Sequence, residues 1–410
     1  MEAARSLEAR CCIVGGGPAG VVSGYLLARA GVDVVVLEKH ADFFRDFRGD
    51  TIHPSTLTLM DELGLLDAFL QRPHSEATEL GIRFGSVAVP IADFRHVPGR
   101  CKFLAFMPQW DFLDFFVQQA RAFPGFRIAM GAEATELIRD DDRVTGVVAR
   151  TSEGALTVRA DLVIVAEGRH STLRGRAALT VKNIGAPIDV LWMRLSRKAD
   201  DPGQAFGNVG ADGLLVAIDR GDYYQCAFVI RKGEFAAIEA RGLAAFRERV
   251  GTLAPFLRDR TGELAQWDDV KLLTVTVDRL TTWYRGGLLC IGDAAHAMSP
   301  VGGVGINLAI QDAVATANVL AAPLLAGAAR TQHLRAVQRR RELPTRLTQM
   351  LQVFAQDRIL AGVLAGRART GPPAVVRLFG AIPFLRRLPA FVVGLGFRPE
   401  HVRTGATPLR

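Results

Sequence analysis

Two short motifs, drawn from opposite halves of the chain, carry residue types that could do chemistry. The first is a glycine-rich turn, Gly15-Gly16-Gly17-Pro18-Ala19-Gly20. The second is Gly292-Asp293-Ala294-Ala295-His296, followed by Pro300 and by the run Gly302–Asn307. Turns of the first kind let backbone N–H groups approach a pyrophosphate, so the chemistry to consider is that of a bound dinucleotide.

The first motif has the sequence context that a dinucleotide site needs. The apolar run Cys11–Val14 predicts a buried parallel strand before the turn, and Val21–Ala30 predicts a helix after it. Gly15 permits the tight turn, Gly17 lets the backbone approach the phosphates, and Gly20 lets the helix lie close to the strand. The free N–H groups and the dipole of that helix would then face the phosphates.

A second predicted strand, Val32–Leu37, ends at Glu38. A carboxylate at this position accepts hydrogen bonds from a ribose, and it favours a free 2′-hydroxyl over a 2′-phosphate. FAD or NAD therefore fits better than NADP. Lys39, the next residue, is included among the expected cofactor contacts.

The second motif also lies between a predicted strand, Leu288–Ile291, and a predicted helix that extends to about Leu320. Asn307 and the glycines before it mark a helix start whose free N–H groups point outward. Aimed at the negatively charged edge of a reduced flavin, such a helix end stabilises it by roughly 0.3–2 kcal/mol. The alternative is a glycine loop that merely precedes a core helix.

Taken together, the motifs resemble those of the class A flavoprotein monooxygenases, the family of para-hydroxybenzoate hydroxylase. The resemblance extends from residue 11 to about residue 345. Besides the two glycine motifs it rests on three further sequences: Arg48-Gly49-Asp50, Met107-Pro108-Gln109-Trp110, and Glu167-Gly168-Arg169-His170-Ser171-Thr172-Leu173-Arg174.

The resemblance implies a role for each matching residue. Glu38 would hold the adenosine ribose, Arg48 and Gln109 the middle of FAD, and Asp293 the flavin-side ribitol or the pyrophosphate. The flavin ring would lie along a loop formed by Pro300, Gly303, Val304, Gly305, Ile306 and Asn307. Glu167 departs from the family, which usually has aspartate there; it is expected near FAD or, alternatively, as a solvated loop carboxylate. Arg174 is either a phosphate contact or a surface arginine.

By the same resemblance, NADPH or NADH visits transiently and reduces the FAD, and O2 then forms a flavin C4a-hydroperoxide that hydroxylates an aromatic or phenol-like small molecule. Only one dinucleotide turn is found, which agrees with a transient nicotinamide. No catalytic acid or base can be assigned from the sequence. Five side chains are candidates, and for each a packing or surface role is the stronger interpretation: His53, His96, Trp192, Tyr223 and Tyr224.

Two other functions compete with this one. A flavin-dependent halogenase would need a Trp-x-Trp-x-x-Pro element, and the four tryptophans of this chain are far apart. A non-oxygenating FAD-dependent oxidoreductase or reductase would share the cofactor, but the Pro300–Asn307 loop argues against it.

The order of elements predicts an α/β protein: a Rossmann-like FAD-binding domain, an inserted and mostly antiparallel β-sheet substrate domain, and a helical C-terminal segment. We assign residues 1–75, 105–178 and 279–330 to the first, 76–104 and 179–278 to the second, and 331–410 to the third. Within the insert, the Asp219–Asp222 turn joins two strands, Leu214–Ile218 and Tyr223–Ile230. We also expect single helices over Thr56–Leu70 and Glu234–Val250, and a strand over Lys271–Val277.

The composition is that of a globular protein. The chain is 49% apolar, enough for a real core. Its five cysteines have neither the spacing of metal ligands nor the pattern of a disulfide framework in a secreted protein. No signal peptide is evident, so we expect a cytoplasmic protein without a metal site.

The net charge of +8 comes from the C-terminal part. Residues 330–410 hold 15 arginines, no lysine and three acidic residues, a balance of +12, so the remainder carries −4. Solvated helix faces and interdomain pairs are the first explanation, and peripheral contact with an anionic membrane is the second. No nucleic-acid partner is expected, because basic and aromatic residues do not interleave. The oligomeric state stays open.

Overall fold

Two β-sheets organise the chain in the computed structural model, which describes residues 5–44, 51–85, 87–202, 206–210, 213–360, 362, 372 and 374–407. The first sheet has eight strands, and its central path runs β19-β20-β11-β1-β2-β8. β1, β2, β8, β11 and β20 are parallel to one another, whereas β19, β10 and β9 add antiparallel pairs. The strands are β1 (Arg5–Val14), β2 (Val34–Glu38), β8 (Phe126–Met130), β9 (Glu133–Asp140), β10 (Arg143–Thr151), β11 (Gly154–Val165), β19 (Tyr284–Arg285) and β20 (Leu288–Cys290).

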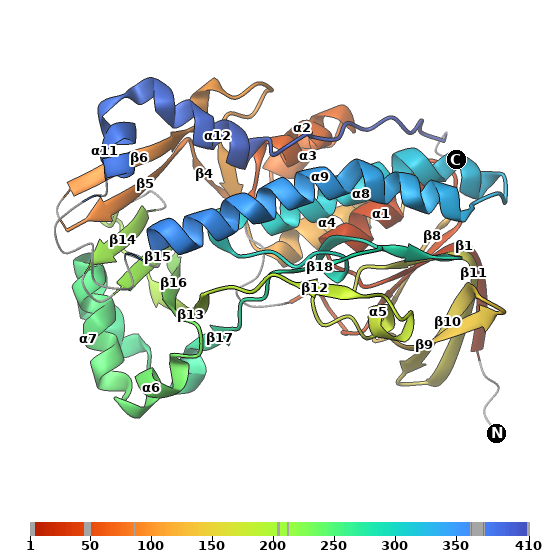
Figure 1. The fold of residues 1–410 in the computed structure, drawn as a ribbon, viewed down its shortest axis with the longest axis horizontal. Helices are drawn as coiled ribbons and strands as arrows, with labels where there is room; N and C mark the ends of the chain where they lie inside the picture. Colours follow the sequence, from red (N-terminus) through yellow and green to blue (C-terminus); the bar gives the residue numbers. More distant parts are fainter. Residues whose placement is uncertain are drawn as a thin grey trace.

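Helices cover this sheet. α1 packs between α8 and α4, and α9 lies along α8 (Figure 1). Gly24 allows α1 to approach the sheet, because a Cβ there would lie 2.9 Å from Val36 Cγ2. Tyr25 and Phe116 make an edge-to-face contact between α1 and α4, with ring centroids 5.4 Å apart. The helices are α1 (Pro18–Arg29), α4 (Gln109–Ala120), α8 (Val304–Leu325) and α9 (Thr331–Ala355).

The second sheet has seven strands in the order β17-β13-β16-β15-β14-β5-β6. All neighbours are antiparallel except β14 and β5, which are parallel. Two segments that are distant in sequence thus share one sheet. The strands are β5 (Glu79–Phe84), β6 (Val87–Asp93), β13 (Ile188–Ser196), β14 (Phe206–Gly210), β15 (Gly213–Asp219), β16 (Tyr223–Arg231) and β17 (Lys271–Leu273).

The two faces of this second sheet bury different cores. Because side chains alternate along a strand, Leu191, Met193 and Leu195 face α6 (Phe235–Ala240) and α7 (Leu243–Leu253). On the opposite face, Val190, Trp192, Ala227 and Val229 form a cluster that includes Val301 of the second motif. This second face therefore packs towards the nucleotide-binding half of the molecule.

Smaller elements connect the two sheets. β3, β7 and β4 form a three-stranded sheet, and β12 pairs with β18. Their bounds, with those of the short helices, are β3 (Thr51–Ile52), α2 (Pro54–Glu62), α3 (Leu66–Leu70), β4 (Ser75–Ala77), η1 (Phe94–His96), β7 (Leu104–Phe106), α5 (Thr172–Arg176), β12 (Val181–Asn183), η2 (Pro255–Glu263), η3 (Trp267–Asp269), β18 (Asp278–Leu280), η4 (Gly292–Ala294), η5 (Val301–Gly303), η6 (Gln356–Leu360) and η8 (Pro383–Arg386).

The predicted fold class is confirmed, with three corrections to individual elements. The single helix expected over Thr56–Leu70 is two helices, because Gly64 adopts φ 70° between them. The helix expected over Glu234–Val250 is likewise interrupted at Gly242, at φ 86°. The strand expected over Lys271–Val277 ends at Leu273, although Val275 and Val277 remain buried.

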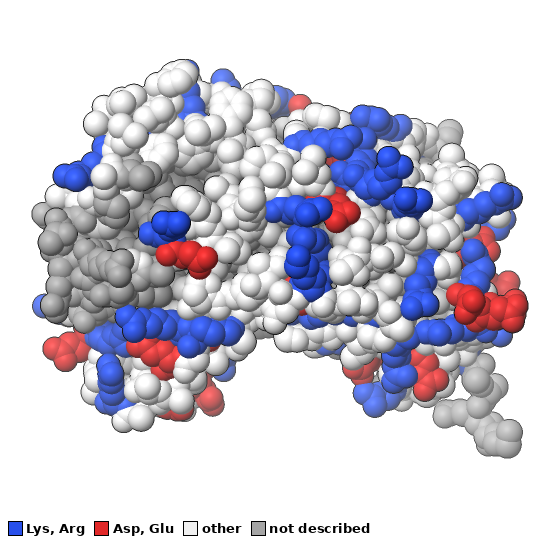
Figure 2. Space-filling view, viewed as in Figure 1, with Lys and Arg blue, Asp and Glu red and all other residues white. Residues whose placement is uncertain are grey.

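The C-terminal segment packs back onto the rest of the protein. α11 (Ala374–Ala381) and α12 (Arg387–Gly394) lie against β6, and the Thr407 N–H donates to the Arg29 carbonyl at 2.8 Å. Some of its arginines are internal: Arg340 and Arg341 both pair with buried Glu400. Others are exposed, and Figure 2 shows Lys and Arg gathered over the N-terminal half of α9, where Arg335 and Arg339 face solvent. The positive charge thus has both structural and surface roles.

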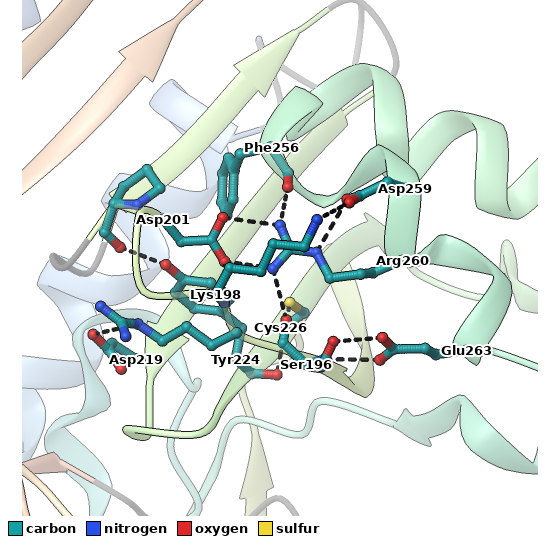
Figure 3. Close-up of polar contacts among 12 residues, drawn as sticks. Ser196, Lys198, Asp201, Asp219, Tyr224, Cys226, Phe256, Asp259, Arg260 and Glu263 are labelled. Carbon is teal, nitrogen blue, oxygen red and sulfur yellow. Dashed lines mark hydrogen bonds and ion pairs between the residues drawn. The ribbon is translucent and has the colours of Figure 1, made fainter.

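A buried arginine fixes the chain that follows β13, up to Pro202. Arg260 pairs with both carboxylate oxygens of Asp201 and donates to the Ser196 and Phe256 carbonyls (Figure 3). The Asp201 hydrogen bond raises the pKa of Arg260, and Arg260 lowers the pKa of Asp201. Tyr224 adds a hydrogen bond to the Pro202 carbonyl at 2.5 Å. These contacts hold residues 196–202 against η2.

By length and composition, one helical stretch among the described residues, Val301–Leu325, could cross a membrane, but 72% of its most apolar window is buried inside the protein. This is the pattern of a core helix. All five cysteines are free and buried.

Candidate FAD site

Four loops meet at one edge of the first sheet. The parallel registers place Val14 beside Leu37 and Val165, and Val165 beside Cys290. The loops that follow these strands therefore start side by side at the carboxyl ends of the strands, where open α/β sheets bind their ligands. These loops carry most of the motif residues identified in the sequence: Gly15, Gly17, Glu38, Glu167 and Asp293.

The glycine turn is as tight as its sequence predicts. Gly15 adopts φ 108°, and a Cβ there would lie 2.4 Å from the Ala166 carbonyl oxygen. A Cβ on Gly20 would lie 1.9 Å from the Gly15 carbonyl oxygen. Gly17 differs, because a Cβ on it would meet nothing within 4 Å. The turn therefore needs Gly15 and Gly20 for its own packing and keeps open space at Gly17, at the N-terminus of α1.

Glu38 is a buried carboxylate at this edge. Its Oε2 accepts the Gly16 N–H at 2.8 Å and its Oε1 accepts the His40 N–H at 3.0 Å, so it ties the end of β2 to the glycine turn. Lys39 is exposed beside it. Ala19 is buried under the second motif, where a Cβ on Gly292 would lie 3.1 Å from the Ala19 Cβ. The two sequence motifs are thus in direct contact.

Asp293 and Arg169 form an ion pair beside this turn, with Nη2 3.2 Å from Oδ2. Arg169 Nη1 is buried and makes no hydrogen bond to any described residue. A buried, unpaired guanidinium N–H fits an anionic partner such as a pyrophosphate. No role was assigned to Arg169 from the sequence alone. The available signal was its position just after Gly168, in the loop that follows a predicted strand.

Glu167 is not a solvated loop carboxylate. Its Oε2 accepts hydrogen bonds from the Ser171 hydroxyl at 2.5 Å and from the Leu173 N–H at 3.2 Å. Burial raises its pKa, and these two donors oppose that effect. Arg174 is not a surface arginine, because its side chain is 13% exposed and pairs with buried Asp278 at 3.3 Å. Both side chains fix the loop that follows β11.

Hydrogen bonds from α9 hold the loop that is expected to contact the flavin ring. Gln352 Nε2 donates to the Ser299 and Val301 carbonyls, each at 2.9 Å. Gly302 and Gly303 adopt φ 79° and 63°, and α8 begins at Val304 with no side-chain cap and no acidic residue in its first turn. The N–H groups at Val304, Gly305 and Ile306 are therefore available to a ligand, with Pro300 at the start of the loop.

The Asn307 side chain joins two distant segments by hydrogen bonds. Its Oδ1 accepts the His53 N–H at 3.0 Å and the Thr56 hydroxyl at 2.7 Å, and its Nδ2 donates to the Thr51 carbonyl at 3.0 Å. This side chain joins α8 to the segment that leads into α2. Gln109, expected at the middle of FAD, is the first residue of α4. Arg48 lies outside the described residues.

A buried ionic cluster supports the second motif, and the sequence did not reveal it. Asp312 of α8 accepts the Gly292 N–H at 3.0 Å, lies 2.6 Å from His296 Nε2 and pairs with Arg341 Nε at 3.0 Å. Burial raises the pKa of Asp312, but His296 and Arg341 outweigh it, so the pKa is lowered overall. His296 therefore acts as local support for the loop. Asp312 follows the second motif within the predicted helix, but its partner Arg341 lies 29 residues further along the chain, so no local pattern joins the two.

The five residues considered for activating the substrate lie in different surroundings. His53 is fully buried with Nδ1 2.5 Å from the Val393 carbonyl oxygen, and burial lowers its pKa to about 4. His96 is a half-exposed partner of Asp93, and Tyr223 lies under Arg194. Tyr224 belongs to the sheet face that packs on α7, away from the flavin loop. Trp192 alone shares a cluster with Val301 of that loop.

Comparison with known proteins agrees with this geometry. Residues 8–350 match the family described as FAD binding domain. The chain is 33% identical over 367 residues to 6-methylpretetramide 4-monooxygenase of Streptomyces rimosus, covering 89% of this chain and 87% of that protein.

Solved structures share the fold. p-Nitrophenol 4-monooxygenase PnpA of Pseudomonas putida superposes with a TM-score of 0.77 at 23% identity, covering 94% of this chain and 97% of that one. OxyS anhydrotetracycline hydroxylase of Streptomyces rimosus gives a TM-score of 0.74 at 22% identity, covering 95% and 76%. With the glycine turn, the converging strand ends and the uncapped α8 in place, the chain belongs to the FAD binding domain family and is an FAD-dependent monooxygenase of aromatic compounds.

Proposed function

We propose that the protein uses NADPH or NADH and O2 to hydroxylate a bulky phenol-like aromatic molecule held between the flavin loop and the second sheet. The observation that carries this proposal is the apolar sheet face made by Val190, Trp192, Ala227 and Val229, which shares a cluster with Val301. An aromatic ring would replace water there at little cost, since these four side chains are apolar apart from the Trp192 N–H.

Two polar groups on this face suit a phenol oxygen. Trp192 Nε1 and Gln225 Nε2 are buried, and neither makes a hydrogen bond to a described residue. Trp192 lies opposite Ala227 in the β13–β16 register, so Gln225 is its diagonal neighbour on the same face. Unpaired buried donors favour a ligand with an acceptor oxygen, because such a ligand satisfies them. These two side chains would orient the ring.

FAD, when bound, supplies the electron storage and oxygen transfer. The residues of this chain do the rest. The glycine turn and Arg169 would hold the pyrophosphate, Glu38 would bind the adenosine ribose, and Asp293 would bind the flavin-side ribitol or the pyrophosphate. The free N–H groups at the start of α8 would stabilise negative charge that develops on the ring on reduction, by roughly 0.3–2 kcal/mol.

The relatives guide the choice of substrate probes. The Streptomyces rimosus proteins are named for 6-methylpretetramide and anhydrotetracycline, and the Pseudomonas protein for p-nitrophenol. We therefore propose to measure NADH and NADPH oxidation by the FAD-loaded protein with anhydrotetracycline and with p-nitrophenol, under labelled O2. One labelled oxygen atom in the aromatic product is expected, with the larger molecule stimulating oxidation more. Nicotinamide oxidation without labelled product for any aromatic would favour the non-oxygenating alternative.

The proposed substrate position has its own test. Trp192→Phe keeps the ring and removes the N–H, so we expect KM for the aromatic substrate to rise roughly three- to tenfold, the value of one hydrogen bond. Trp267→Phe is the matched control, because Trp267 packs on the opposite core with Phe235 and Phe246. Equal kinetics for the two variants would place the substrate elsewhere.

A further inference from the structure

A separate cavity of about 240 Å³ lies behind the flavin loop. Its walls are one face of α8, the middle and end of α9, the turn at His53, and the chain from Val392 to Pro399. No residue of the seven-stranded sheet lines it. The cavity therefore differs from the aromatic position proposed above, which is bounded by that sheet.

The walls are mostly apolar. Valine, leucine, alanine, phenylalanine and proline side chains make up most of the lining, from the flavin loop, α8, the end of α9 and the chain from Val392 to Pro399. An apolar cavity of about 150 Å³ is already large enough to bind benzene. At about 240 Å³, this cavity has room for a molecule of two fused rings.

Two lining residues carry buried donors that no described residue satisfies. Arg341 is fully buried and its Nη2 has no hydrogen-bond partner, although its other nitrogens engage Asp312 and Glu400. Gln311 is 4% exposed; its Oε1 accepts the Glu400 N–H, while its Nε2 is unpaired. An unsatisfied buried donor is costly, so both atoms favour an acceptor brought by a ligand.

The charges around these donors indicate whether the ligand's acceptor oxygen is neutral or negatively charged. Arg341 is already balanced by Asp312 and Glu400, and Glu400 pairs in addition with Arg340. No positive charge is left over at this end of the cavity, so a neutral oxygen is favoured over a carboxylate. Of the other polar lining residues, Gln352 has both ends of its amide committed to Ser299 and Val301. His53 Nε2 is also buried and unpaired among the described residues, but it is an acceptor, because Nδ1 donates to the Val393 carbonyl. The two donors that remain therefore select a neutral two-ring molecule with a carbonyl oxygen.

We propose that this cavity is a second binding site, for a neutral, bicyclic-sized ketone or related carbonyl compound whose oxygen accepts from Gln311 and Arg341. The site shares Val301, Gly302 and Val304 with the flavin loop. Its occupant therefore lies directly against the segment expected to hold the flavin ring, on the side away from the sheet.

The probe is 1-tetralone, with tetralin as the matched ligand that lacks the oxygen. Isothermal titration of the FAD-loaded protein should show that 1-tetralone binds roughly tenfold more tightly than tetralin, the difference made by one or two hydrogen bonds. Equal affinity for the two ligands, or no binding of 1-tetralone up to its solubility limit, would overturn the proposal.

Two variants of α9 locate the site. Ala355→Phe fills the cavity from its wall and should weaken 1-tetralone binding at least roughly tenfold, since the displaced volume is the binding volume. Ala336→Phe places the same side chain on the exposed face of the same helix and should leave the affinity unchanged. Unchanged binding by Ala355→Phe would contradict the assignment. Should that variant not fold, a crystal structure of the wild-type protein with 1-tetralone decides: density against Gln311 supports the site, and density only elsewhere refutes it.

Discussion

Replacing Gly17 with alanine should separate folding from cofactor binding. Gly17 has φ −74° and ψ −177°, a conformation that alanine adopts without strain, and its Cβ would meet nothing within 4 Å. The apoprotein should therefore keep its stability or gain up to about 1 kcal/mol, because alanine restricts the unfolded chain. The same methyl group would occupy the space assigned to the FAD pyrophosphate.

The loss of affinity follows from the contacts that the methyl group displaces. A hydrogen bond from a backbone N–H to a charged phosphate contributes about 1.5–3 kcal/mol. Displacing one such contact weakens FAD binding roughly ten- to hundredfold, at about 1.4 kcal/mol for each factor of ten. Fluorescence titration of FAD into the apoprotein measures this change directly, and urea denaturation of the same sample measures stability.

Two companion variants complete the comparison. Gly15→Ala should destabilise the apoprotein itself by at least about 1–3 kcal/mol, because of its φ of 108° and a Cβ only 2.4 Å from the Ala166 carbonyl oxygen. Gly262→Ala, in η2, also meets nothing within 4 Å and should leave FAD affinity unchanged. Wild-type FAD affinity in the Gly17 variant would refute the pyrophosphate position, and wild-type stability in the Gly15 variant would refute the turn geometry.

Three further predictions concern the buried polar groups. Asp312→Asn should lower the free energy of unfolding by about 3–5 kcal/mol, because Arg341 loses its buried carboxylate; a gain in stability on denaturation would argue against the cluster. His53 has a folded pKa of about 4 against 6.5 unfolded, so the unfolded chain takes up this proton first. Stability should therefore fall by about 3 kcal/mol from pH 6.5 to 4 and level off below, and His53→Gln should lose that component of the pH profile while exposed His96→Gln keeps it. Arg260→Met should destabilise by about 3–5 kcal/mol by leaving Asp201 buried and unpaired, and adding Asp201→Leu should recover part of the loss; additive effects in this double-mutant cycle would contradict the pairing.

The sequence predicts local features that depend on neighbouring residues. The glycine turn, Glu38 and the strand before Asp293 were predictable because each is a short pattern whose conformation is dictated by glycine or by apolar β-branched residues. The errors at Gly64 and Gly242 have the same local origin: in both places the apolar helical pattern continues past a glycine that turns the chain to positive φ.

What the sequence did not predict depends on contacts between distant segments. Asp312, Arg341 and Glu400 are isolated charges in the sequence until α8, α9 and the C-terminal chain pack together. The parallel pairing of β14 with β5 joins residues that no local pattern connects. The cavity behind the flavin loop has the same character, because its walls come from four separate stretches of chain.

The central claim is that one FAD extends from the glycine turn of the first motif to the loop of the second. Titration of the apoprotein with FAD and with FMN tests it, because FMN keeps the ring and lacks the adenosine half that Gly17 and Glu38 are expected to hold. One FAD should bind per chain, and FMN should bind at least roughly a hundredfold more weakly, the value of two lost charged hydrogen bonds. Equal affinity for FAD and FMN, or no flavin binding at all, would contradict the claim.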